Sequence, residues 1–569
     1  MQLSNNSSFS RRRTTASHLL RSGNFKEILI RAFRILSRPK SKDQLIDYKE
    51  WHKKWVEISP KDEKVIADLN HSLPHKPSFS INLILDEVNP NALSAIIKSI
   101  KEQIYPNWIL NVITADQIDL KSLKETIPLN DERIKITKFE TAELKDWVIN
   151  LDSKTLLNKA ALFSVASSIF KEPEASLIYS DNDYINSSGL FCDPYMKPNW
   201  NSDLFESINF LKPFMVFRKN LLQKGLSKRI NDHEFLIQTT RKLKTKEILH
   251  IPQILASTYA IDNESHLVPE IKIKEENFSD IAPLVSIIIP TRDQGRMLKT
   301  CLDSIYQKTS YKNFEIVLVD HQSKEKKAKR VIHSLKENRN SQIIEFSGEF
   351  NFSAMVNKGA EVSAGEILVF LNNDTEIIEE DWLELLVSQT VKQEVGVCGS
   401  LLLFKNRTIQ HAGIHPTQSG LMTHGYKHES ENSSGYFGHL KVRHQVMAVT
   451  GACLATRRNI WLSLGGFDEE HLKVAYNDVD FCLKAREAGF LVLFEPRVKL
   501  FHHESASRGI EKELSRNNRL REEVAYMRKR WGEFLFVDPI SNPNLLINED
   551  GIGLNPFPKI PPIWKTLDK

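Results

Sequence analysis

Long apolar runs and cysteine pairs are both missing from this sequence. No apolar stretch in its 569 residues approaches the ~20 residues that a helix needs to span a bilayer. The opening residues also lack the apolar core of a secretory signal peptide. The five cysteines form no CxxC pair, and their odd number argues against both a disulfide framework and a structural zinc site. We therefore expect a protein of the reducing cytoplasm.

An excess of charge of one sign is missing as well. The net charge is only +5, so we expect no nucleic-acid partner. Positive charge gathers instead near the N-terminus, beside apolar side chains between residues 25 and 36. The basic residues are Arg11, Arg12, Arg13, Arg21, Lys26, Arg31, Arg34, Arg38, Lys40 and Lys42. One interpretation is a basic amphipathic helix that makes peripheral contact with the anionic inner face of the plasma membrane. The alternative is a disordered basic tail followed by a helix that packs on the body of the protein.

The chain looks internally duplicated. Apolar strand-like runs at 80–85 and 285–289 each open a segment with the same order of signals, a helical stretch and then a second strand. Both segments also end alike, with DHEF at 232–235 leading to Pro252 and DVDF at 478–481 leading to Pro496. The stretch between the copies is polar and lacks periodicity, so we interpret it as a linker. The predicted organisation is a basic, partly helical N-terminal segment (1–47), a first copy (48–256), a linker (257–283), a second copy (284–540) and a C-terminal tail (541–569).

Strand-like and helical patterns alternate in the second copy. Buried strand runs at 316–319 and 367–371 are interleaved with helical patterns at 297–307, 353–362 and 381–389. This alternation predicts an α/β domain built on a mainly parallel sheet. Because ligands of such sheets lie at the carboxyl ends of the strands, the residues just past those ends are the candidates for a site.

Polar residues follow three of the predicted strands. They are the segment PTRD at 290–293, Asp320, and the segment NND at 372–374. Asp374 would be placed to hold a hard divalent cation that bridges two phosphates. A strand-end aspartate is more often a helix cap or a turn residue, so each of these signals is weak by itself.

Longer motifs are more specific. The stretches VSIIIPTRDQ, EIVLVDHQS, FNFSAMVNKGAEVSAGEILVFLNNDTEI, AVTGACLATRR, GGFDE, NDVDFCLKAREAGF and FHHESASRG follow one another between residues 285 and 509. In order and spacing they resemble the family 2 glycosyltransferases of the GT-A fold, of the bacterial type that builds O-antigen and other surface polysaccharides. The resemblance implies two tandem, Rossmann-like GT-A domains. It also implies an inverting transferase that moves a sugar from a nucleotide sugar to a hydroxyl of a saccharide or lipid-linked saccharide, with Mg²⁺ or Mn²⁺ as cofactor.

The resemblance also implies a nucleotide-sugar site. Its residues would be Pro290, Thr291, Asp293, Asp320, Asn357, Lys358, Asn372, Asn373 and Asp374. Asp320 would face the base. Asp374 would carry most of the cation contact, because Asn372 replaces the first carboxylate of the family's DxD motif. His502 matches the histidine that approaches the cation and the diphosphate, and His503 is the weaker choice. His321 stands where the family often has Asn, which leaves the donor sugar undefined.

Asp478 is the candidate general base. A sugar hydroxyl has a pKa far above neutrality, so a positioned carboxylate must take its proton during the attack. A helix predicted over 481–487 would place Asp478 at or near the N-cap, where the helix dipole keeps a carboxylate ionised. Capping alone is the other interpretation, and Asp480 is the substitute base. The resemblance places Gly451, Gly466 and Asp480 on the acceptor side.

The first copy resembles the family but lacks its chemistry. At the metal position stands DSK at 152–154, where the lysine would oppose a divalent cation. No segment corresponds to NFSAMVNKG, and no histidine follows Pro252 at the distance that separates Pro496 from His502. The motif DND at 181–183 comes after the metal position in the shared order, so we interpret it as structural or acceptor-facing. We predict a domain that has lost catalysis and that orients the second domain or holds a growing saccharide.

Two alternatives come from other functional classes. A nucleotidyltransferase would need a glycine-rich phosphate loop near the first strand, and PTRDQGR is a poor one. A non-catalytic saccharide-binding or scaffold protein of a polysaccharide assembly complex would not need Asp374, Asp478 and His502 together.

Overall fold

The computed structural model describes residues 47–85, 89–114, 127, 130–222, 232–260, 270–272, 282–337, 340–417, 419–503, 513–548 and 551–566. The predicted N-terminal basic segment and most of the predicted linker lie outside these residues. The chain divides into two compact units. The N-terminal unit includes Ile46–Lys272, Ile540–Leu545 and Leu554–Lys569, and the C-terminal unit includes Ile273–Pro539 and Leu546–Gly553. Within the described part of the chain, no helix combines the length and the apolar character that crossing a bilayer requires.

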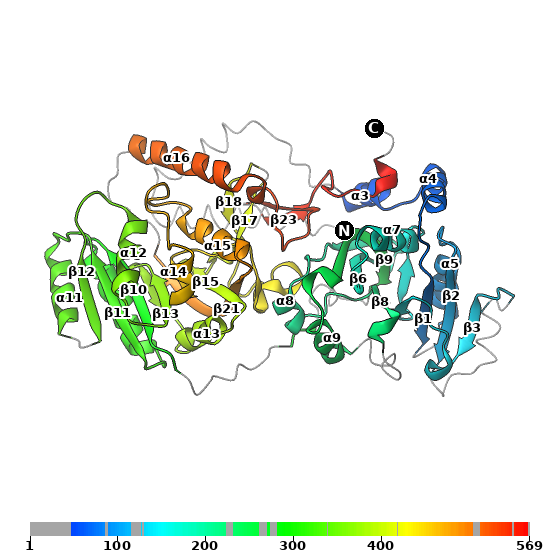
Figure 1. Ribbon diagram of the computed structural model, residues 1–569, viewed down its shortest axis with the longest axis horizontal. Coiled ribbons are helices and arrows are strands. Elements are labelled where there is room, and N and C mark those ends of the chain that lie inside the picture. Colours follow the sequence, from blue (N-terminus) through cyan, green and yellow to red (C-terminus); the bar gives the residue numbers. More distant parts are fainter. Residues whose placement is uncertain are drawn as a thin grey trace. The chain divides into compact units, whose positions relative to one another are not determined.

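The C-terminal unit is built on a ten-stranded sheet (Figure 1). Its main path runs in the order β12, β11, β10, β13, β20, β15, β21, β14, with β16 beside β15 and β19 beside β21. The strands are β10 (Val285–Thr291), β11 (Phe314–Asp320), β12 (Ser341–Glu345), β13 (Ile367–Leu371), β14 (Thr375–Ile377), β15 (Val395–Leu403), β16 (Ile409–His411), β19 (His444–Gln445), β20 (Cys453–Arg457) and β21 (Leu491–His502). β10 to β13 pair in parallel, whereas the other half of the sheet is mixed. The predicted α/β class is confirmed.

The described α-helices of this unit are α10 (Gly295–Lys308), α11 (Lys326–Lys336), α12 (Phe352–Val362), α13 (Trp382–Thr390), α14 (Arg458–Ser463), α15 (Asn477–Glu487) and α16 (Glu513–Trp531). The predicted helices at 297–307, 353–362, 381–389 and 481–487 correspond to α10, α12, α13 and α15, whereas α11, α14 and α16 were not predicted. α10 buries an apolar stripe that includes Leu298, Leu302 and Ile305, as amphipathic spacing requires. α12 begins where the Asn351 side chain accepts a hydrogen bond from the Ala354 N–H, which is an N-cap contact.

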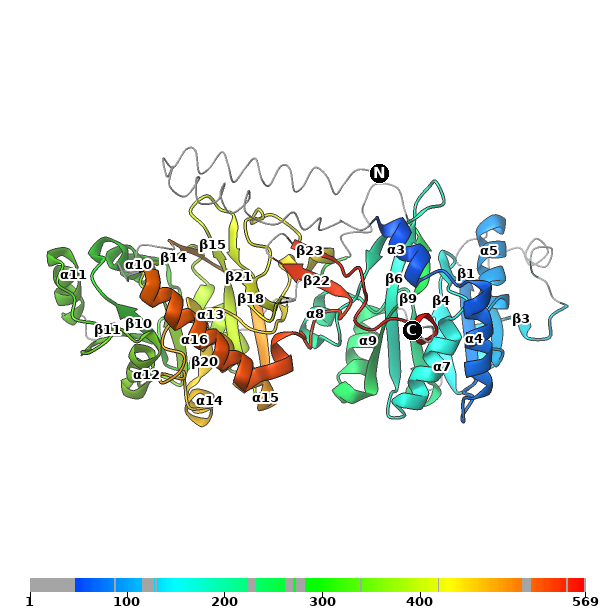
Figure 2. The same cartoon turned by 90° about the horizontal axis from the view of Figure 1, so that it is seen from above.

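The N-terminal unit repeats the same sheet. Its main path runs β3, β2, β1, β4, β8, β6, β9, β5, with β7 beside β6, which matches the C-terminal sheet except that β19 has no counterpart. Figure 2 shows strands β1, β4, β6 and β9 of this sheet. Parallel and antiparallel pairs match as well. The strands are β1 (Phe79–Leu85), β2 (Trp108–Thr114), β3 (Ile134–Thr137), β4 (Trp147–Leu151), β5 (Thr155–Leu157), β6 (Leu177–Ile185), β7 (Phe191–Tyr195), β8 (Met215–Arg218) and β9 (Ile248–Tyr259). The helices are α3 (Tyr48–Trp55), α4 (Pro60–His71), α5 (Pro90–Lys101), α7 (Ala161–Lys171), α8 (Ser202–Ser207) and α9 (His233–Thr240). The predicted tandem arrangement is confirmed.

Each unit contains the same tyrosine hydrogen bond at an equivalent position. The Tyr105 hydroxyl donates to the Pro77 carbonyl at 2.7 Å, and the Tyr311 hydroxyl donates to the Pro283 carbonyl at 2.6 Å. One helix is not repeated, because only a 3-10 turn (Phe139–Thr141) lies between β3 and β4, where the C-terminal unit has α12. The missing counterpart of NFSAMVNKG is therefore a missing helix.

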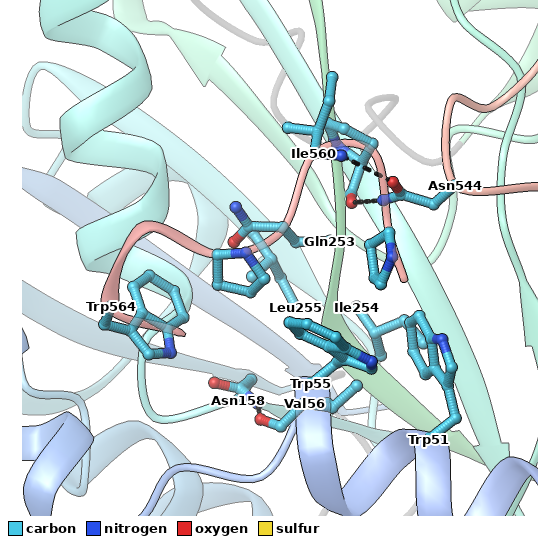
Figure 3. A pocket seen from close by; sticks show the side chains of 13 residues that line it. Trp51, Trp55, Val56, Asn158, Gln253, Ile254, Leu255, Asn544, Ile560 and Trp564 are labelled. Atoms are coloured by element: carbon cyan, nitrogen blue, oxygen red, sulfur yellow. Dashed lines mark hydrogen bonds between the residues drawn. The ribbon is translucent and has the colours of Figure 1, made fainter. Parts of the chain in front are cut away.

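Residues 554–566, predicted as part of a tail, pack into the N-terminal unit. Trp564 is 5% exposed and belongs to the main apolar core of that unit. Trp51 on α3 donates its indole N–H to the Asn555 carbonyl at 2.9 Å. Trp51, Trp55 and Trp564 surround a small pocket between α3, β9 and these C-terminal residues (Figure 3). The short strands β22 (Leu545–Asn548) and β23 (Gly551–Leu554) pair just before them.

Candidate active site

The ends of β10, β11 and β13 bring the predicted nucleotide-binding residues to one edge of the sheet. Thr291 and Asp320 lie opposite each other in the β10–β11 pair. Asn373, just past β13, donates from Nδ2 to Thr291 Oγ1 at 2.8 Å, and both of these side chains are buried. This contact ties the predicted metal motif to the strand that ends in Pro290 and Thr291.

Asp293 and Asp320 shape the loop after β11. Asp320 Oδ1 accepts hydrogen bonds from the Ser323 N–H at 3.1 Å and from its hydroxyl at 2.5 Å. Asp293 Oδ1 accepts from the N–H groups of Lys324 and Glu325 at 2.6 and 2.8 Å. These bonds, that from Glu325 foremost, lower the pKa of the Asp293 carboxyl. Asp293 thus has a loop-fixing role that the resemblance did not indicate.

The contacts of His321 give a structural reason for a histidine where the family often has asparagine. Its backbone N–H donates to the Thr291 carbonyl at 2.9 Å. Its buried imidazole lies with Nε2 3.0 Å from the Gly348 carbonyl and stacks on Phe350. The side chain therefore joins the β11 loop to the residues that follow β12.

Asp374 and His502 form a close pair. His502 lies opposite Thr375 in the antiparallel β14–β21 pair, which brings its imidazole beside Asp374. His502 Nε2 is 3.1 Å from Asp374 Oδ1 and 3.3 Å from Asn372 Nδ2, and Asp374 is 2% exposed. His503 instead directs Nε2 toward Glu376 Oε2 at 3.1 Å. Of the two candidate histidines, His502 is the one that reaches the buried carboxylate.

The pair suits a hard divalent cation. An octahedral ion with ligands at ~2.1 Å has adjacent ligand atoms about 3 Å apart, close to the 3.1 Å that separates His502 Nε2 from Asp374 Oδ1. Among the residues that the structure describes, no group of three or more His, Cys, Asp or Glu side chains could hold a metal. Asp374 and His502 would therefore supply part of a coordination shell and leave positions for phosphate oxygens and water.

Gln410 is a site residue that the sequence did not reveal. It lies on β16, is 5% exposed, and places Oε1 2.7 Å from His502 Nδ1. Its Nε2 donates to the His502 carbonyl at 3.4 Å. A glutamine in a short strand 92 positions before its partner carries no recognisable motif.

Asp478 lies in the first turn of α15. The preceding Tyr476 adopts a left-handed conformation with φ 63°, which starts the helix abruptly. Asp478 Oδ2 accepts the Gly451 N–H at 2.9 Å, and Oδ1 accepts the Val479 N–H at 2.8 Å. Burial raises the pKa of the Asp478 carboxyl, against the opposing effect of these two bonds. A carboxylate with a raised pKa is a better proton acceptor.

One turn links the candidate base to the metal motif. Gly451 donates its N–H to Asp478, and the carbonyl of the next residue, Ala452, accepts the Asn372 N–H at 3.0 Å. Asp478 and the segment 372–374 therefore contact the same short stretch of backbone.

Asp480 has a different environment from Asp478. It is fully buried, with Oδ2 3.3 Å from Lys484 Nζ and Oδ1 3.3 Å from Arg530 Nε. The indole N–H of Trp531, at the end of α16, donates to Oδ1 at 2.9 Å. A buried carboxylate held in this way cannot contact an acceptor, so its predicted acceptor-side and substitute-base roles do not fit its position.

Asn357 and Gly466 form a second structural contact. Asn357 Nδ2 donates to the Phe467 carbonyl at 2.9 Å, and Oδ1 accepts the Phe467 N–H at 3.0 Å. Gly466 has φ 61°, and a Cβ there would lie 2.7 Å from Asn357 Oδ1, so the position requires glycine. Lys358 is exposed and pairs with Glu361 at 2.7 Å. The structure thus gives Asn357 the task of fixing the GGFDE loop.

Comparison with known proteins agrees with the resemblance read from the motifs. Residues 286–460 match Glycosyl transferase family 2. This region is a family 2 glycosyltransferase domain. The chain is 32% identical over 545 residues to the uncharacterized protein y4gI of Sinorhizobium fredii, covering 86% of this chain and 60% of that protein. It is 28% identical over 526 residues to the O-antigen biosynthesis protein RfbC of Myxococcus xanthus, covering 83% of this chain and 40% of that protein. The chain spans less than two thirds of either relative. A crystal structure of GalNAc-T7 with UDP, GalNAc and Mn²⁺ aligns with 45% of this chain and 49% of its own at 17% identity and a TM-score of 0.36.

The N-terminal unit has other residues at the positions that correspond to Asp374 and His502. Thr258 lies opposite Thr155 in the β5–β9 pair, as His502 lies opposite Thr375 in the β14–β21 pair. Lys154 takes the place of Asp374. The backbone hydrogen bonds match as well: the Tyr259 N–H donates to the Lys154 carbonyl at 3.1 Å, and the His503 N–H donates to the Asp374 carbonyl at 2.9 Å. A lysine and a threonine thus replace a carboxylate and an imidazole.

Asp181 and Asp183 in the same unit are buried. Asp181 Oδ1 lies 2.8 Å from His250 Nε2, and the Tyr48 hydroxyl donates a hydrogen bond to Asp183 Oδ2 at 2.6 Å. Burial raises the pKa of Asp183 to about 7. Of the two predicted roles for the DND motif, the structural one fits these contacts.

Proposed function

We propose that the chain is an inverting glycosyltransferase of cell-surface polysaccharide synthesis. It would move a sugar from a nucleotide sugar to a hydroxyl of a saccharide or lipid-linked saccharide. The observation that carries the proposal is the position of Asp478, which lies after the matched region 286–460 but in the same compact unit. This carboxylate has a raised pKa and contacts the backbone turn that also holds the segment 372–374.

The proposed reaction is a single displacement. Asp478 accepts the proton of the acceptor hydroxyl as the hydroxyl oxygen bonds to C1 of the donor sugar. The bond from C1 to the nucleoside diphosphate breaks in the same step, so the configuration at C1 inverts and no covalent intermediate forms. Such a reaction needs one base. Asp480 does not compete for that role, because two cationic side chains and an indole N–H already surround it.

A divalent cation, Mg²⁺ or Mn²⁺, is the proposed cofactor. Asp374 and His502 would hold it, and when bound it would offset negative charge on the departing diphosphate. The donor would lie along the strand ends, with its nucleoside near Thr291 and Asp320. His502 and Asp374 remain on β21 and just past β13, so the sheet itself fixes their separation.

The N-terminal unit has a non-catalytic role in this proposal. Lys154 and Thr258 provide no cation site, and the helix equivalent to α12 is missing. We assign to this unit the orientation of the glycosyltransferase domain or the holding of the growing saccharide. The protein would act in the cytoplasm, at the inner face of the plasma membrane, with the basic N-terminal segment as the membrane contact.

Donor turnover tests the proposal directly. The purified chain is incubated with a panel of nucleotide sugars and Mn²⁺, with and without extracts of lipid-linked saccharides, and nucleoside diphosphate is measured. Release of nucleoside diphosphate that Asp478→Asn suppresses is the expected result. In a parallel incubation with nucleoside triphosphates and sugar 1-phosphates, release of pyrophosphate would instead assign a nucleotidyltransferase. Binding of a saccharide without any turnover would assign a scaffold.

A further inference from the structure

We infer that Gln410 is a positioning residue that fixes the proton on His502 Nδ1 and thereby leaves His502 Nε2 free to bind a divalent cation. The inference rests on the proposed cation site at Asp374 and His502. It adds a residue that lies outside every motif of the sequence and that does not touch the donor itself.

The two ends of the Gln410 amide can be distinguished by their partners. Its Nε2 faces the His502 carbonyl at 3.4 Å, and a carbonyl accepts only from a donor. The other end, Oε1, is therefore the atom that lies 2.7 Å from His502 Nδ1. Because an amide oxygen is only an acceptor, Nδ1 must carry a proton.

That assignment decides what the other ring nitrogen does. With the proton on Nδ1, the neutral imidazole has its lone pair on Nε2, which faces Asn372 Nδ2 at 3.3 Å and Asp374 Oδ1 at 3.1 Å. A nitrogen lone pair and a carboxylate oxygen repel each other at this distance unless a cation or a proton lies between them. The opposite tautomer would direct an N–H at Asp374 and close the position to a metal ion.

Burial makes the effect specific to the side chain of Gln410. The residue is 5% exposed on β16, which is held by its pairing with β15. If the Gln410 amide oxygen were removed, bulk water would have poor access to take its place as the acceptor for His502 Nδ1. The amide is also neutral, so it orients the imidazole without adding charge to the site. Contacts of this kind, from a metal ligand's second ring nitrogen to a buried acceptor, typically change metal affinity 10–100-fold.

Three variants separate this role from a packing role. Gln410→Met keeps the length of the side chain but removes the acceptor, and Gln410→Glu keeps an acceptor for Nδ1. Gln389→Met is the matched control, because Gln389 is also buried but lies on α13, where its side chain bonds to Ser388 on that helix and to Lys392 just after it. Mn²⁺ affinity is measured by electron paramagnetic resonance in the presence of UDP or GDP, with thermal unfolding recorded for each variant.

The expected result is a roughly 10–100-fold loss of Mn²⁺ affinity in Gln410→Met, with affinity within a few-fold of the parent in Gln410→Glu and Gln389→Met. In a His502→Ala background, Gln410→Met should cause no further loss, because the two residues act through one ligand. Unchanged affinity in Gln410→Met, or an equal loss in the His502→Ala background, would overturn the inference while leaving the cation site in place. Absence of Mn²⁺ binding by the parent protein with either nucleotide would remove the cation site itself, and this inference with it.

Discussion

Replacing Asp478 by asparagine separates its proposed chemical role from its capping role. The change removes the basic oxygen but keeps the size of the side chain. We expect transfer to fall by roughly 10²–10⁴, because a positioned general base contributes about that factor. This corresponds to about 3–5 kcal/mol in the activation barrier.

The structural cost of the same change is smaller and follows from its two hydrogen bonds. The carboxylate accepts from the Gly451 N–H and from the Val479 N–H with different oxygens. Asparagine has one acceptor oxygen, so one of these N–H groups loses its partner, at a cost of about 1–3 kcal/mol in stability. Nucleotide binding should stay nearly intact, because the strand-end residues 290–293 and 372–374 are unchanged.

Asp480→Asn is the matched comparison. It would leave Lys484 without its buried counter-charge, whereas Arg530 keeps Asp468 as a partner, and breaking a buried ion pair costs about 3–5 kcal/mol in stability. We expect a lowered midpoint of urea unfolding in this variant, with residual transfer by the molecules that stay folded. Asp478→Asn should show the reverse pattern, a folded protein with little transfer.

The pH profile gives a third readout. Burial raises the pKa of Asp478, so transfer should fall on acidification through a pKa above the ~3.9 of an exposed aspartate. The acid limb of kcat/KM should therefore lie above that pH in the parent and disappear in Asp478→Asn. Unimpaired turnover in Asp478→Asn, or an unchanged acid limb, would refute the assignment of the base.

Other changes have equally direct outcomes. Excess chelator should abolish transfer and added Mn²⁺ or Mg²⁺ should restore it, and full activity in chelator would contradict a cation held by Asp374. Joint replacement of Lys154 and Thr258 by alanine should leave the transfer rate within a few-fold, whereas a transferase activity that survives Asp478→Asn and responds to this change would make the protein bifunctional. Deletion up to Lys42, a segment outside the described residues, should lower binding to anionic vesicles by about 1 kcal/mol per basic residue near the surface and spare activity on a soluble acceptor; equal vesicle binding would refute a membrane contact. Trp564→Ala should lower the stability of the N-terminal unit by about 3–5 kcal/mol in urea unfolding, and a change under 1 kcal/mol would show that its burial matters little.

The parts of the fold that depend on local patterns could be predicted from the sequence. The run at 367–371 is a strand over the same residues, and the helix predicted over 353–362 spans Phe352–Val362. The predicted strand ends then indicated at which edge of the sheet the polar residues gather, because parallel strands end at a common edge. The family motifs supplied the candidates at Asp374, Asp478 and His502.

The features that the sequence did not predict depend on contacts between residues far apart in the chain. The burial of Asp480 is produced by α16, whose Trp531 and Arg530 lie some fifty residues later in the chain. The role of Gln410 requires β16 to lie near the end of β21, and no periodicity or spacing indicates this. Residues 554–566 have little regular pattern and are held by partners at the opposite end of the chain. Tertiary contacts, not local propensity, decide all three.

The two units also show why fold alone does not determine function. They share strand order, pairing direction and even the backbone hydrogen bond at Lys154 and Asp374. Those common features rest on apolar strands and backbone geometry, which tolerate different side chains at the strand ends. The proposed cation site instead depends on one carboxylate, Asp374, one imidazole, His502, and the Gln410 amide that contacts it. In this proposal, a lysine and a threonine in the first unit remove the cation site without disturbing the sheet, so that unit would persist for its surface or its contacts while the second unit carries out the transfer.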